Sequence, residues 1–351
     1  MAELARTALT QMFGIERPIL CGGLMWLSDA KYVAASARAR CMGFITTRSF
    51  DDARSVRAEI RKCRDLAAGR PFGVNLTVSA RESANRRVNA DLDAALEEGV
   101  RHFETAGLPP GDLVRRIHDA GGVVIHKCSS TRHALSAQAM GVDAVAIVGM
   151  EEGGHPGMNE LPASLLGALA SERLRIPFAL GGGIGTGAQI LAALSLGAGA
   201  VVMGSRFLVA EEIAVHPAYK NRLLECDENS TMTVLRSLRN TWRVLRNDTA
   251  EEVARIEASG ADNHEAFGEL ILGRYARDHC YREGDWSRGM LSLGPAIAFA
   301  DRIQPTEEIV EQLMAEFTAA SHRLASVLGL AVRIDCTDRP SYDSAIDKES
   351  V

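Results

Sequence analysis

Residues Pro177 to Ser205 read PFALGGGIGTGAQILAALSLGAGAVVMGS, and this stretch decides the fold. It contains two short apolar runs, Pro177–Leu180 and Ala200–Met203, which are typical of strands buried on both faces of a parallel sheet. Between them, Thr186–Leu196 carries apolar residues at helical spacing. A strand, a helix and a second strand in this order predict one repeat of a parallel α/β sheet.

The same unit repeats along the chain before this stretch. With the two runs above, eight candidate strands result: Pro18–Cys21, Gly43–Thr46, Phe72–Leu76, His102–Thr105, Val123–His126, Ala144–Val148, Pro177–Leu180 and Ala200–Met203. Helical periodicity fills the segments between them: Ala30–Ala39, Asp52–Leu66, Ala90–Glu98, Gly111–Ala120, Thr131–Met140, Leu161–Ser171 and Thr186–Leu196. Eight such units predict an α/β fold of the TIM-type (β/α)8 class, because closing the parallel sheet removes its exposed edges.

The pattern changes after Phe207 to a charged, helix-rich stretch with few strand candidates. We therefore expect a small helical second domain over residues 213–274, after the eighth strand. The barrel itself is expected to comprise residues 1–212 and 275–330, with Thr306–Leu328 as an amphipathic helix that completes it. Residues 331–351 carry little core material and are expected to form a mobile tail.

Composition excludes several classes of protein. Hydrophobic residues make up 46% and charged residues 24%, which suits a globular chain, and the net charge of -6 gives no general attraction to nucleic acid. We expect no membrane insertion, because no run of about 18 apolar residues occurs, and the chain start lacks the pattern of a signal peptide. The seven scattered cysteines predict reduced thiols in a cytoplasmic protein and no zinc or other metal site.

Two glycine clusters follow the last two predicted strands. Gly181-Gly182-Gly183 and Gly204-Ser205 lie where barrels commonly bind phosphate through backbone N–H groups. Either cluster alone is equally compatible with a tight turn, but both in succession favour an anion. Gly183 to Ala188 also matches the dinucleotide pattern G-x-G-x-x-A, yet the acidic residue expected about 20 positions later is absent.

Two further side chains follow predicted strands and carry candidate chemistry. Lys127 follows the fifth strand, where its ammonium could stabilise the negative charge of a reduced flavin at the N1–C2 carbonyl pole; pairing with a neighbouring carboxylate is the alternative. His155 lies in a glycine-rich loop after the sixth strand and is the best candidate base, since imidazole titrates near neutrality. A structural histidine is the alternative there.

A group of arginines appears at helical spacing in the expected second domain. Arg236, Arg239, Arg243 and Arg246 would share one side of a helix and could receive an anionic substrate or the phosphates of a pyridine nucleotide. A solvated helix face held by salt bridges fits the same spacing.

Together these motifs resemble the nitronate monooxygenases, formerly called 2-nitropropane dioxygenases, which are FMN barrels with a small helical second domain. The resemblance extends through about Leu330. Within that superfamily, five stretches look especially like the bacterial NADH:quinone reductases formerly assigned as nitronate monooxygenases: Pro18–Trp26, Pro71–Thr77, Val124–Cys128, Gly154–Gly157 and Arg236–Asn247.

The resemblance implies FMN as the cofactor and assigns its contacts. The implied contacts are Gly22, Gly23, Leu24, Thr77, Lys127, Gly181, Gly182, Gly183, Gly204 and Ser205, with Asn75 as a weaker candidate. His155 stands at the position of the catalytic histidine. Candidates for contact with substrate or nucleotide are Met25, Trp26, Arg236, Arg239 and Arg243. The chain departs from its relatives at Cys21, where Gln or Ala is usual, and at Val148, where the quinone reductases have Asp.

Two reactions are compatible with this resemblance. In the first, a nitronate or nitroalkane reduces FMN and O2 reoxidises it. In the second, NADH or NADPH is the electron donor and a quinone is the acceptor. An FMN-dependent enoyl reductase and a non-redox barrel that binds a phosphorylated metabolite are further alternatives, and a homo-oligomer is possible in each case.

Overall fold

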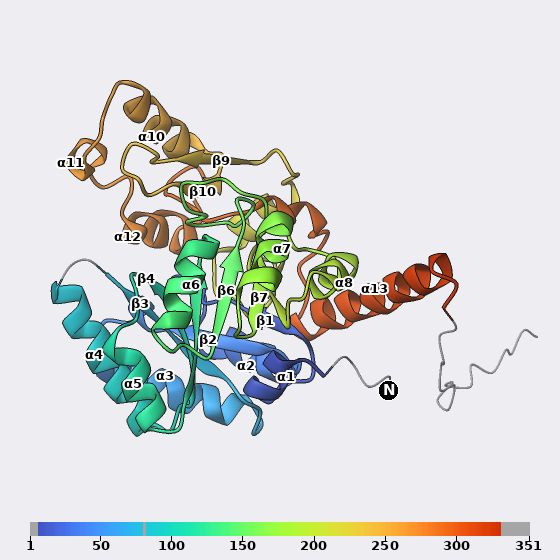
Figure 1. The fold of residues 1–351 in the computed structure, drawn as a ribbon. Helices are drawn as coiled ribbons and strands as arrows, with labels where there is room; N and C mark the ends of the chain where they lie inside the picture. The colour runs from blue at the N-terminus through green and yellow to red at the C-terminus, as the bar shows by residue number, and fades with distance from the viewer. Residues whose placement is uncertain (1–5, 80–81, 331–351) are drawn as a thin grey trace, which may run out of the picture.

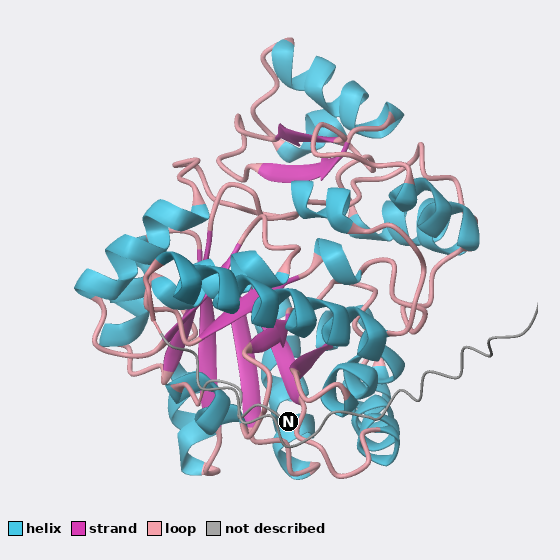
Figure 2. Cartoon of the chain, turned by 90° about the vertical axis from the view of Figure 1, so that its right-hand side faces the viewer, coloured by secondary structure: helices cyan, strands magenta, loops and turns pink. Residues whose placement is uncertain are grey.

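The computed structural model describes residues 6–79 and 82–330, and its centre is a closed barrel of eight parallel strands (Figures 1 and 2). The strands follow one another in chain order, and β8 closes the barrel by pairing with β1 at Ile19 and Val201. Their bounds are β1 Ile19–Cys21, β2 Met42–Thr46, β3 Gly73–Val78, β4 His102–Gly107, β5 Val123–Cys128, β6 Ala144–Val148, β7 Phe178–Gly181 and β8 Ala200–Met203. The predicted (β/α)8 barrel is thus confirmed.

Helices connect the strands and cover the outside of the barrel (Figure 2). Short polar side chains begin several of them: Asp29 caps α2, Asp52 caps α3, and Thr186 forms a capping box with Gln189 at α8. The bounds are α2 Ala30–Arg38, α3 Ala53–Leu66, α4 Glu82–Glu97, α5 Asp112–Asp119, α6 Thr131–Ala139, α7 Ala163–Arg173 and α8 Gly187–Ser195. The predicted helices agree with these bounds within a few residues, with one exception. Helix α4 begins before the predicted Ala90, and the prediction missed its first turns because they carry few apolar residues.

Two hydrophobic layers stabilise the barrel. Small and branched side chains fill its interior, among them Ile125, Ala146 and Val202. Helix α1 (Ala8–Phe13) adds Leu9 and Phe13 to this interior core. A larger layer packs between the strands and the surrounding helices. Every residue of β6 and β8 is buried, as expected of parallel strands that are covered on both faces.

The region after β8 contains a β-ribbon as well as helices, and here one prediction was wrong. Strands β9 (Thr231–Val234) and β10 (Trp242–Leu245) pair antiparallel, so the predicted arginine-bearing helix over residues 236–246 does not form. β-branched and aromatic residues occupy both strands and favour extended backbone, while the arginine spacing matched a helix only by coincidence. The ribbon packs on α10 (Asp248–Ala258) around a separate small core. The other helices are α9 Pro217–Leu224, α11 His264–Phe267 and α12 Gly273–Ala276.

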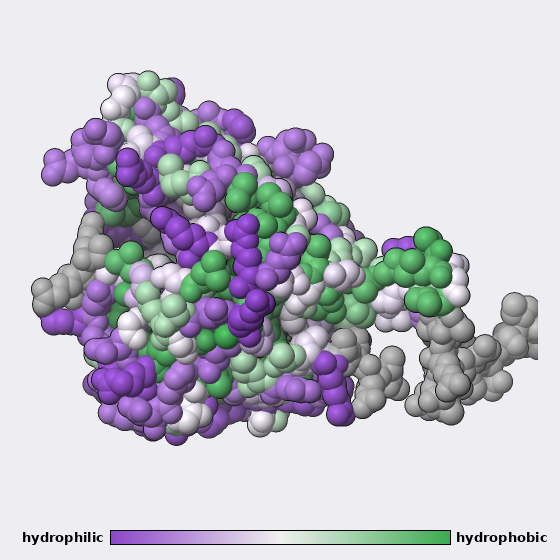
Figure 3. Space-filling model, in the orientation of Figure 1, coloured by the Kyte–Doolittle hydropathy of each residue, from purple (hydrophilic) through white to green (hydrophobic). Residues whose placement is uncertain are grey.

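The last described segment returns to the barrel and ends in a long helix, α13 (Thr306–Val327), which lies against α8 and α2 (Figure 1). Gly187 is needed at this contact, because a Cβ there would lie only 2.1 Å from the Leu313 carbonyl oxygen. The end of α13 projects from the body and exposes apolar side chains such as Val327 and Leu328 (Figure 3). The predicted tail over residues 331–351 lies outside the described residues.

Candidate functional site

A cavity of about 990 Å³ opens at the carboxyl ends of the barrel strands, beneath the β-ribbon region. Parallel barrels place their binding residues at this end, because the loops that follow all strands meet there. Of the predicted residues, these line the cavity: Gly22, Gly23, Leu24, Met25, Trp26, Thr77, Lys127, His155, Gly182, Gly183, Gly204, Ser205 and Arg239. Asn75, Gly181, Arg236 and Arg243 lie outside its lining.

The two glycine clusters form one wall of the cavity. Gly182 and Gly183 have φ angles of 103° and 69°, which favour glycine, and a Cβ at Gly182 would lie 3.0 Å from the Gly149 backbone nitrogen. Ser205 is fixed in the same wall, because its Oγ accepts a hydrogen bond of 2.8 Å from the Gly294 N–H. A loop that lacks side chains and exposes backbone fits a phosphate group.

Two predicted contacts stand behind this wall. Gly181 is the last residue of β7, and a Cβ there would lie 3.1 Å from both Val148 and Val202. Asn75 is buried below Gly23, where a Cβ on Gly23 would come within 2.8 Å of the Asn75 Cβ. Both residues therefore shape the cavity from outside its surface.

Lys127 forms a charge pair with Glu104 at the floor of the cavity. Its Nζ lies 3.3 Å from Glu104 Oε1, and the Glu104 side chain is only 1% exposed. Asn75 Nδ2 and the Gly23 N–H donate to the other carboxylate oxygen, over 2.5 and 3.3 Å. The carboxylate pairing considered as the alternative for Lys127 is thus present, although Lys127 also faces the cavity.

The charge on Lys127 is stabilised by its neighbours. Burial disfavours the ammonium, but the charges of Glu104 and Glu152 and the hydrogen bond to Glu104 outweigh this effect and raise the Lys127 pKa above its ordinary value. The lysine is therefore a cation near neutral pH and offers positive charge to a ligand in the cavity.

His155 lies in the loop after β6, and its ring packs on Trp242 with 4.8 Å between the centroids. Its Nδ1 is 3.2 Å from the Thr241 carbonyl oxygen, so this nitrogen donates a proton and Nε2 remains an acceptor. The ring is open to the cavity, yet the surrounding protein atoms bury it enough to lower its pKa despite the backbone hydrogen bonds that act in the opposite direction. A neutral imidazole that carries its proton on Nδ1 is suited to accept a second one at Nε2.

The β-ribbon holds the loop that carries His155. Gly154 and Arg243 exchange backbone hydrogen bonds of 3.0 and 2.7 Å, so the loop extends the ribbon by one bridge. The Arg243 guanidinium donates to the Met150 carbonyl oxygen over 2.8 Å and to Thr231 Oγ1 over 3.1 Å. Arg243, predicted to receive substrate, therefore positions the loop, whereas Arg236 pairs with Glu160.

Trp26 closes the cavity beneath the ribbon region. Its φ of 70° is unusual for a bulky residue, and its backbone N–H donates to Ser49 Oγ over 2.7 Å. The Arg277 guanidinium lies 4.8 Å from the Trp26 ring centroid, in cation–π geometry. These contacts hold the indole at the cavity wall.

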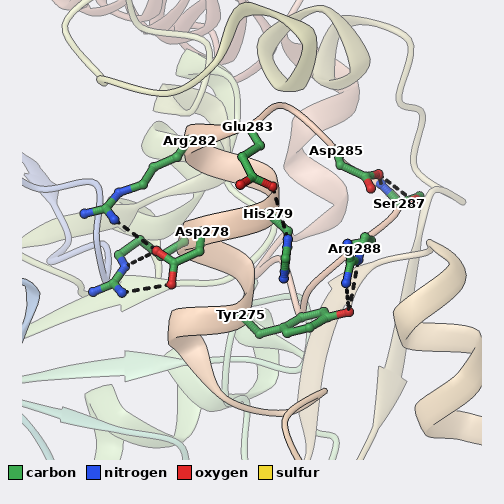
Figure 4. Close-up of polar contacts among 9 residues, drawn as sticks. Tyr275, Asp278, His279, Arg282, Glu283, Asp285, Ser287 and Arg288 are labelled. Carbon is green, nitrogen blue, oxygen red and sulfur yellow. Dashed lines mark hydrogen bonds and ion pairs between the residues drawn. The ribbon is translucent and has the colours of Figure 1, made fainter.

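Arg277 belongs to a π-helical turn, Arg277–Arg282, that is rich in polar contacts (Figure 4). Asp278 accepts hydrogen bonds from Arg277 over 2.8 and 3.0 Å and from Arg282 over 3.1 Å. Beside them, the Arg288 guanidinium donates twice to the hydroxyl oxygen of Tyr275 (Figure 4). The network therefore fixes the side chain that contacts Trp26.

Sequence reasoning missed several residues in and around the cavity, among them Glu104, Glu152, His126 and Trp242. Glu104 left a signal, since it is the one carboxylate within the otherwise uncharged core of the predicted strand His102–Thr105. The departure Val148 faces the cavity as an apolar residue, whereas Cys21 is fully buried in the layer outside the barrel. Only contacts between distant segments reveal the remaining members.

The closed barrel and the cavity at the carboxyl ends of its strands place the chain in the (β/α)8 class, and the names of its relatives identify it as an oxidoreductase enzyme. The family model for nitronate monooxygenase matches residues 6–316, and this chain belongs to that family. No described helix is long and apolar enough to cross a membrane.

Individual relatives carry different names. The chain is 33% identical over 71% of its length to (3aS,4S,5R,7aS)-5-hydroxy-7a-methyl-1-oxo-octahydro-1H-indene-4-carboxyl-CoA dehydrogenase of Mycobacterium tuberculosis, of which 68% is covered. FabK from Thermotoga maritima is similar in structure, with a TM-score of 0.83 and 30% identity over 92% of this chain and 99% of that one. Nitroalkane oxidase from Streptomyces ansochromogenes matches with a TM-score of 0.77 and 26% identity over 91% and 100%.

Proposed function

We propose that this chain is an FMN-dependent oxidoreductase that oxidises a nitroalkane or its nitronate, with O2 as the electron acceptor. The observation that carries this proposal is the arrangement of His155, whose Nδ1 donates to the Thr241 carbonyl oxygen and whose side chain lines the same cavity as Lys127. A base and a cation in one cavity suit a carbon acid, because the base removes the proton and the cation stabilises the resulting anion.

The residues of the cavity fit FMN. Gly182, Gly183, Gly204 and Ser205 would hold its phosphate, while Lys127 would face the ring system. When bound, the flavin supplies the two-electron chemistry that amino-acid side chains lack. At about 990 Å³ the cavity lies at the upper end of ordinary ligand sites, about 300–1,000 Å³, so a substrate fits beside a cofactor.

His155 performs the proton step in this proposal. Its Nε2 accepts the carbon-bound proton of a neutral nitroalkane, and the electron pair stays on the substrate as the nitronate. Trp242 fixes the ring from one side, and Thr241 fixes its tautomer. A substrate that arrives already deprotonated does not need this step.

A second candidate function is favoured by the rim of the cavity. Arg132 and Arg239 line it, and neither pairs with a carboxylate within residues 6–79 and 82–330. Two exposed guanidinium groups suit a phosphate-bearing electron donor. The donor would then be NADH or NADPH, with a quinone as acceptor, or a CoA thioester such as the M. tuberculosis relative's name describes.

Anaerobic mixing separates these candidates. Purified flavin-loaded protein is mixed in turn with propyl-3-nitronate, NADH, NADPH and an acyl-CoA, and the flavin absorbance is followed. Rapid bleaching by the nitronate supports the proposal. Bleaching by a nicotinamide or by the thioester, without any by the nitronate, contradicts it and supports the second candidate.

A further inference from the structure

Glu152 is a carboxylate in the cavity that the proposed function does not use. It lies in the loop after β6, three residues before His155, and lines the cavity. Its carboxylate has no hydrogen-bond partner among the residues that the structure describes. A partly buried acid without a structural partner is available for proton exchange.

The preceding residue shows what a structural carboxylate looks like in the same loop. Glu151 points toward the start of α7, where its oxygens accept from the Ala163 N–H over 3.1 and 3.3 Å. Its carboxylate also lies under Gly182, 3.3 Å from the position of a Cβ there. Glu151 thus stabilises the loop, and this explanation does not extend to Glu152.

The charges around Glu152 are those of the cavity floor. Lys127 from β5 and Glu104 from β4 both act on it electrostatically. Burial raises the Glu152 pKa to about 7, Lys127 opposes this, and Glu104 supports it. The other titratable or charged side chains that line the cavity are Glu151, His155, Cys128, Arg132, His133, Arg239, Tyr281 and His126, whose pKa burial lowers to about 4.

We propose that Glu152 takes up a proton when a flavin in this cavity is reduced, and so compensates the negative charge that arrives beside Lys127. This inference rests on the proposed function, since it requires the flavin. One cation faces two carboxylates at the floor, and Glu104 already pairs with the lysine. A further negative charge therefore favours the protonated form of the remaining acid.

The proton and electron count follows from this assignment. Two electrons from the reductant and one proton convert the oxidised flavin to its anionic reduced form. One further proton from water binds the Glu152 carboxylate. Below about pH 7 Glu152 is protonated in both states and adds nothing, whereas just above it the second proton is taken up, because the reduced flavin raises the Glu152 pKa.

The pH dependence of the midpoint potential tests the proposal on holoenzyme titrated with dithionite and a reference dye, from about pH 6 to about pH 9. Wild-type protein is expected to change from one proton per electron pair to about two as the pH rises above about 7. Glu152→Gln should keep a one-proton slope throughout. Glu152→Asp should restore the bend at a shifted pH.

A matched variant and a second readout complete the test. Glu172→Gln makes the same substitution at an exposed position on α7, and its midpoint potential should depend on pH as that of the wild type does. An indicator dye at about pH 8 should record about one proton fewer on reduction of Glu152→Gln than of wild type. A bend that persists in Glu152→Gln, or a wild type without a bend, contradicts the proposed role of Glu152 and leaves the proposed function standing. Purified protein that neither holds nor accepts a flavin contradicts the proposed function as well.

Discussion

Lys127 and Glu104 show how a single pair can serve both stability and chemistry. Glu104 is 1% exposed, and its carboxylate is stabilised by hydrogen bonds from Asn75 and Gly23 and by the Lys127 ammonium 3.3 Å away. The same ammonium faces the cavity. Its loss should therefore change the protein in two separately measurable ways.

We predict that Lys127→Met lowers the flavin midpoint potential and the free energy of unfolding. Removing one partner of a buried ion pair typically costs about 3–5 kcal/mol, and the remaining hydrogen bonds of Glu104 should keep the loss near the lower end. Urea denaturation and dye titration measure the two effects. The double variant Lys127→Met/Glu104→Gln should regain much of the stability but not the potential. Unchanged potential in the flavin-loaded single variant would place Lys127 away from the ring.

His155→Asn is predicted to act on one substrate form and spare the other. Turnover of a neutral nitroalkane should fall by about 10²–10⁴-fold, because its carbon-bound proton must be removed by a base. Oxidation of the nitronate should change far less. Steady-state O2 consumption with both forms provides the comparison. Small and equal losses would rule out the base role, and persistent NAD(P)H oxidation in this variant would favour the second candidate function.

For single residues, the sequence predicted those near the carboxyl ends of strands. His155, Gly182, Gly183 and Gly204 follow β6 to β8 and line one cavity together with Lys127, which lies near the end of β5. The pairing of Lys127 with Glu104 needed the register of β4 against β5, and periodicity does not specify which carboxylate faces inward. The sequence does not distinguish Glu152 from Glu151. The structure does, because the Ala163 N–H at the start of α7 donates to the Glu151 carboxylate.

At the scale of elements, the ribbon β9–β10 connects the region after β8 to the catalytic loop. Arg243 contributes its backbone to the bridge with Gly154 and its guanidinium to the Met150 carbonyl oxygen. Arg246, three residues later, pairs at the exposed surface with Glu251. The two arginines therefore form a matched set for testing what holds the loop.

Arg243→Ala should lower kcat by about tenfold or more, while flavin content stays close to that of wild type. Loss of the two side-chain hydrogen bonds removes the link from the ribbon to Met150, and a catalytic group displaced by about 1 Å can lose about 10²-fold in rate. Steady-state kinetics and the ratio of flavin to protein absorbance are the measurements. Arg246→Ala serves as the control and should resemble wild type. Loss of flavin in parallel with activity would indicate that Arg243 supports the cofactor wall instead.

The eight strands could be predicted because each contains a short apolar run, and the seven connecting helices because their apolar faces repeat. The ribbon could not, since its residues alternate with arginines whose spacing also fits a helix. Pairing of Val234 with Trp242 depends on a chain reversal over residues 235–241 that includes Leu235 and Arg239 at positive φ. These residue types seldom adopt positive φ, so the sequence does not predict the reversal.

At the scale of the whole molecule, a buried neutral histidine links folding to pH. His126 lies 5% exposed beside the cavity, its Nδ1 is 2.9 Å from Thr105 Oγ1, and burial lowers its pKa to about 4. In the unfolded chain a histidine titrates near about pH 6.5. The unfolded state therefore binds more protons between these two values, so stability falls as the pH falls through that window.

We expect the free energy of unfolding to decrease by up to about 3 kcal/mol from His126 between about pH 7 and about pH 4. Urea midpoints across this range give the dependence, and the carboxylates add their own losses at the acidic end. His126→Gln should flatten the decline between about pH 6.5 and about pH 4.5 specifically. An identical pH dependence in that variant would mean that the His126 pKa is the same in the folded and the unfolded protein.

The cavity is lined by residues from Gly22 to Ala296, and we propose that a flavin mononucleotide occupies it. The direct measurement is to denature purified protein and identify the released cofactor by chromatography and mass. We expect about one FMN per chain from the wild type. Gly182→Asp should lose the FMN, because its carboxylate would occupy a positive-φ position in the wall formed by the two glycine clusters. Release of FAD, or a colourless protein that FMN cannot reconstitute, would contradict it.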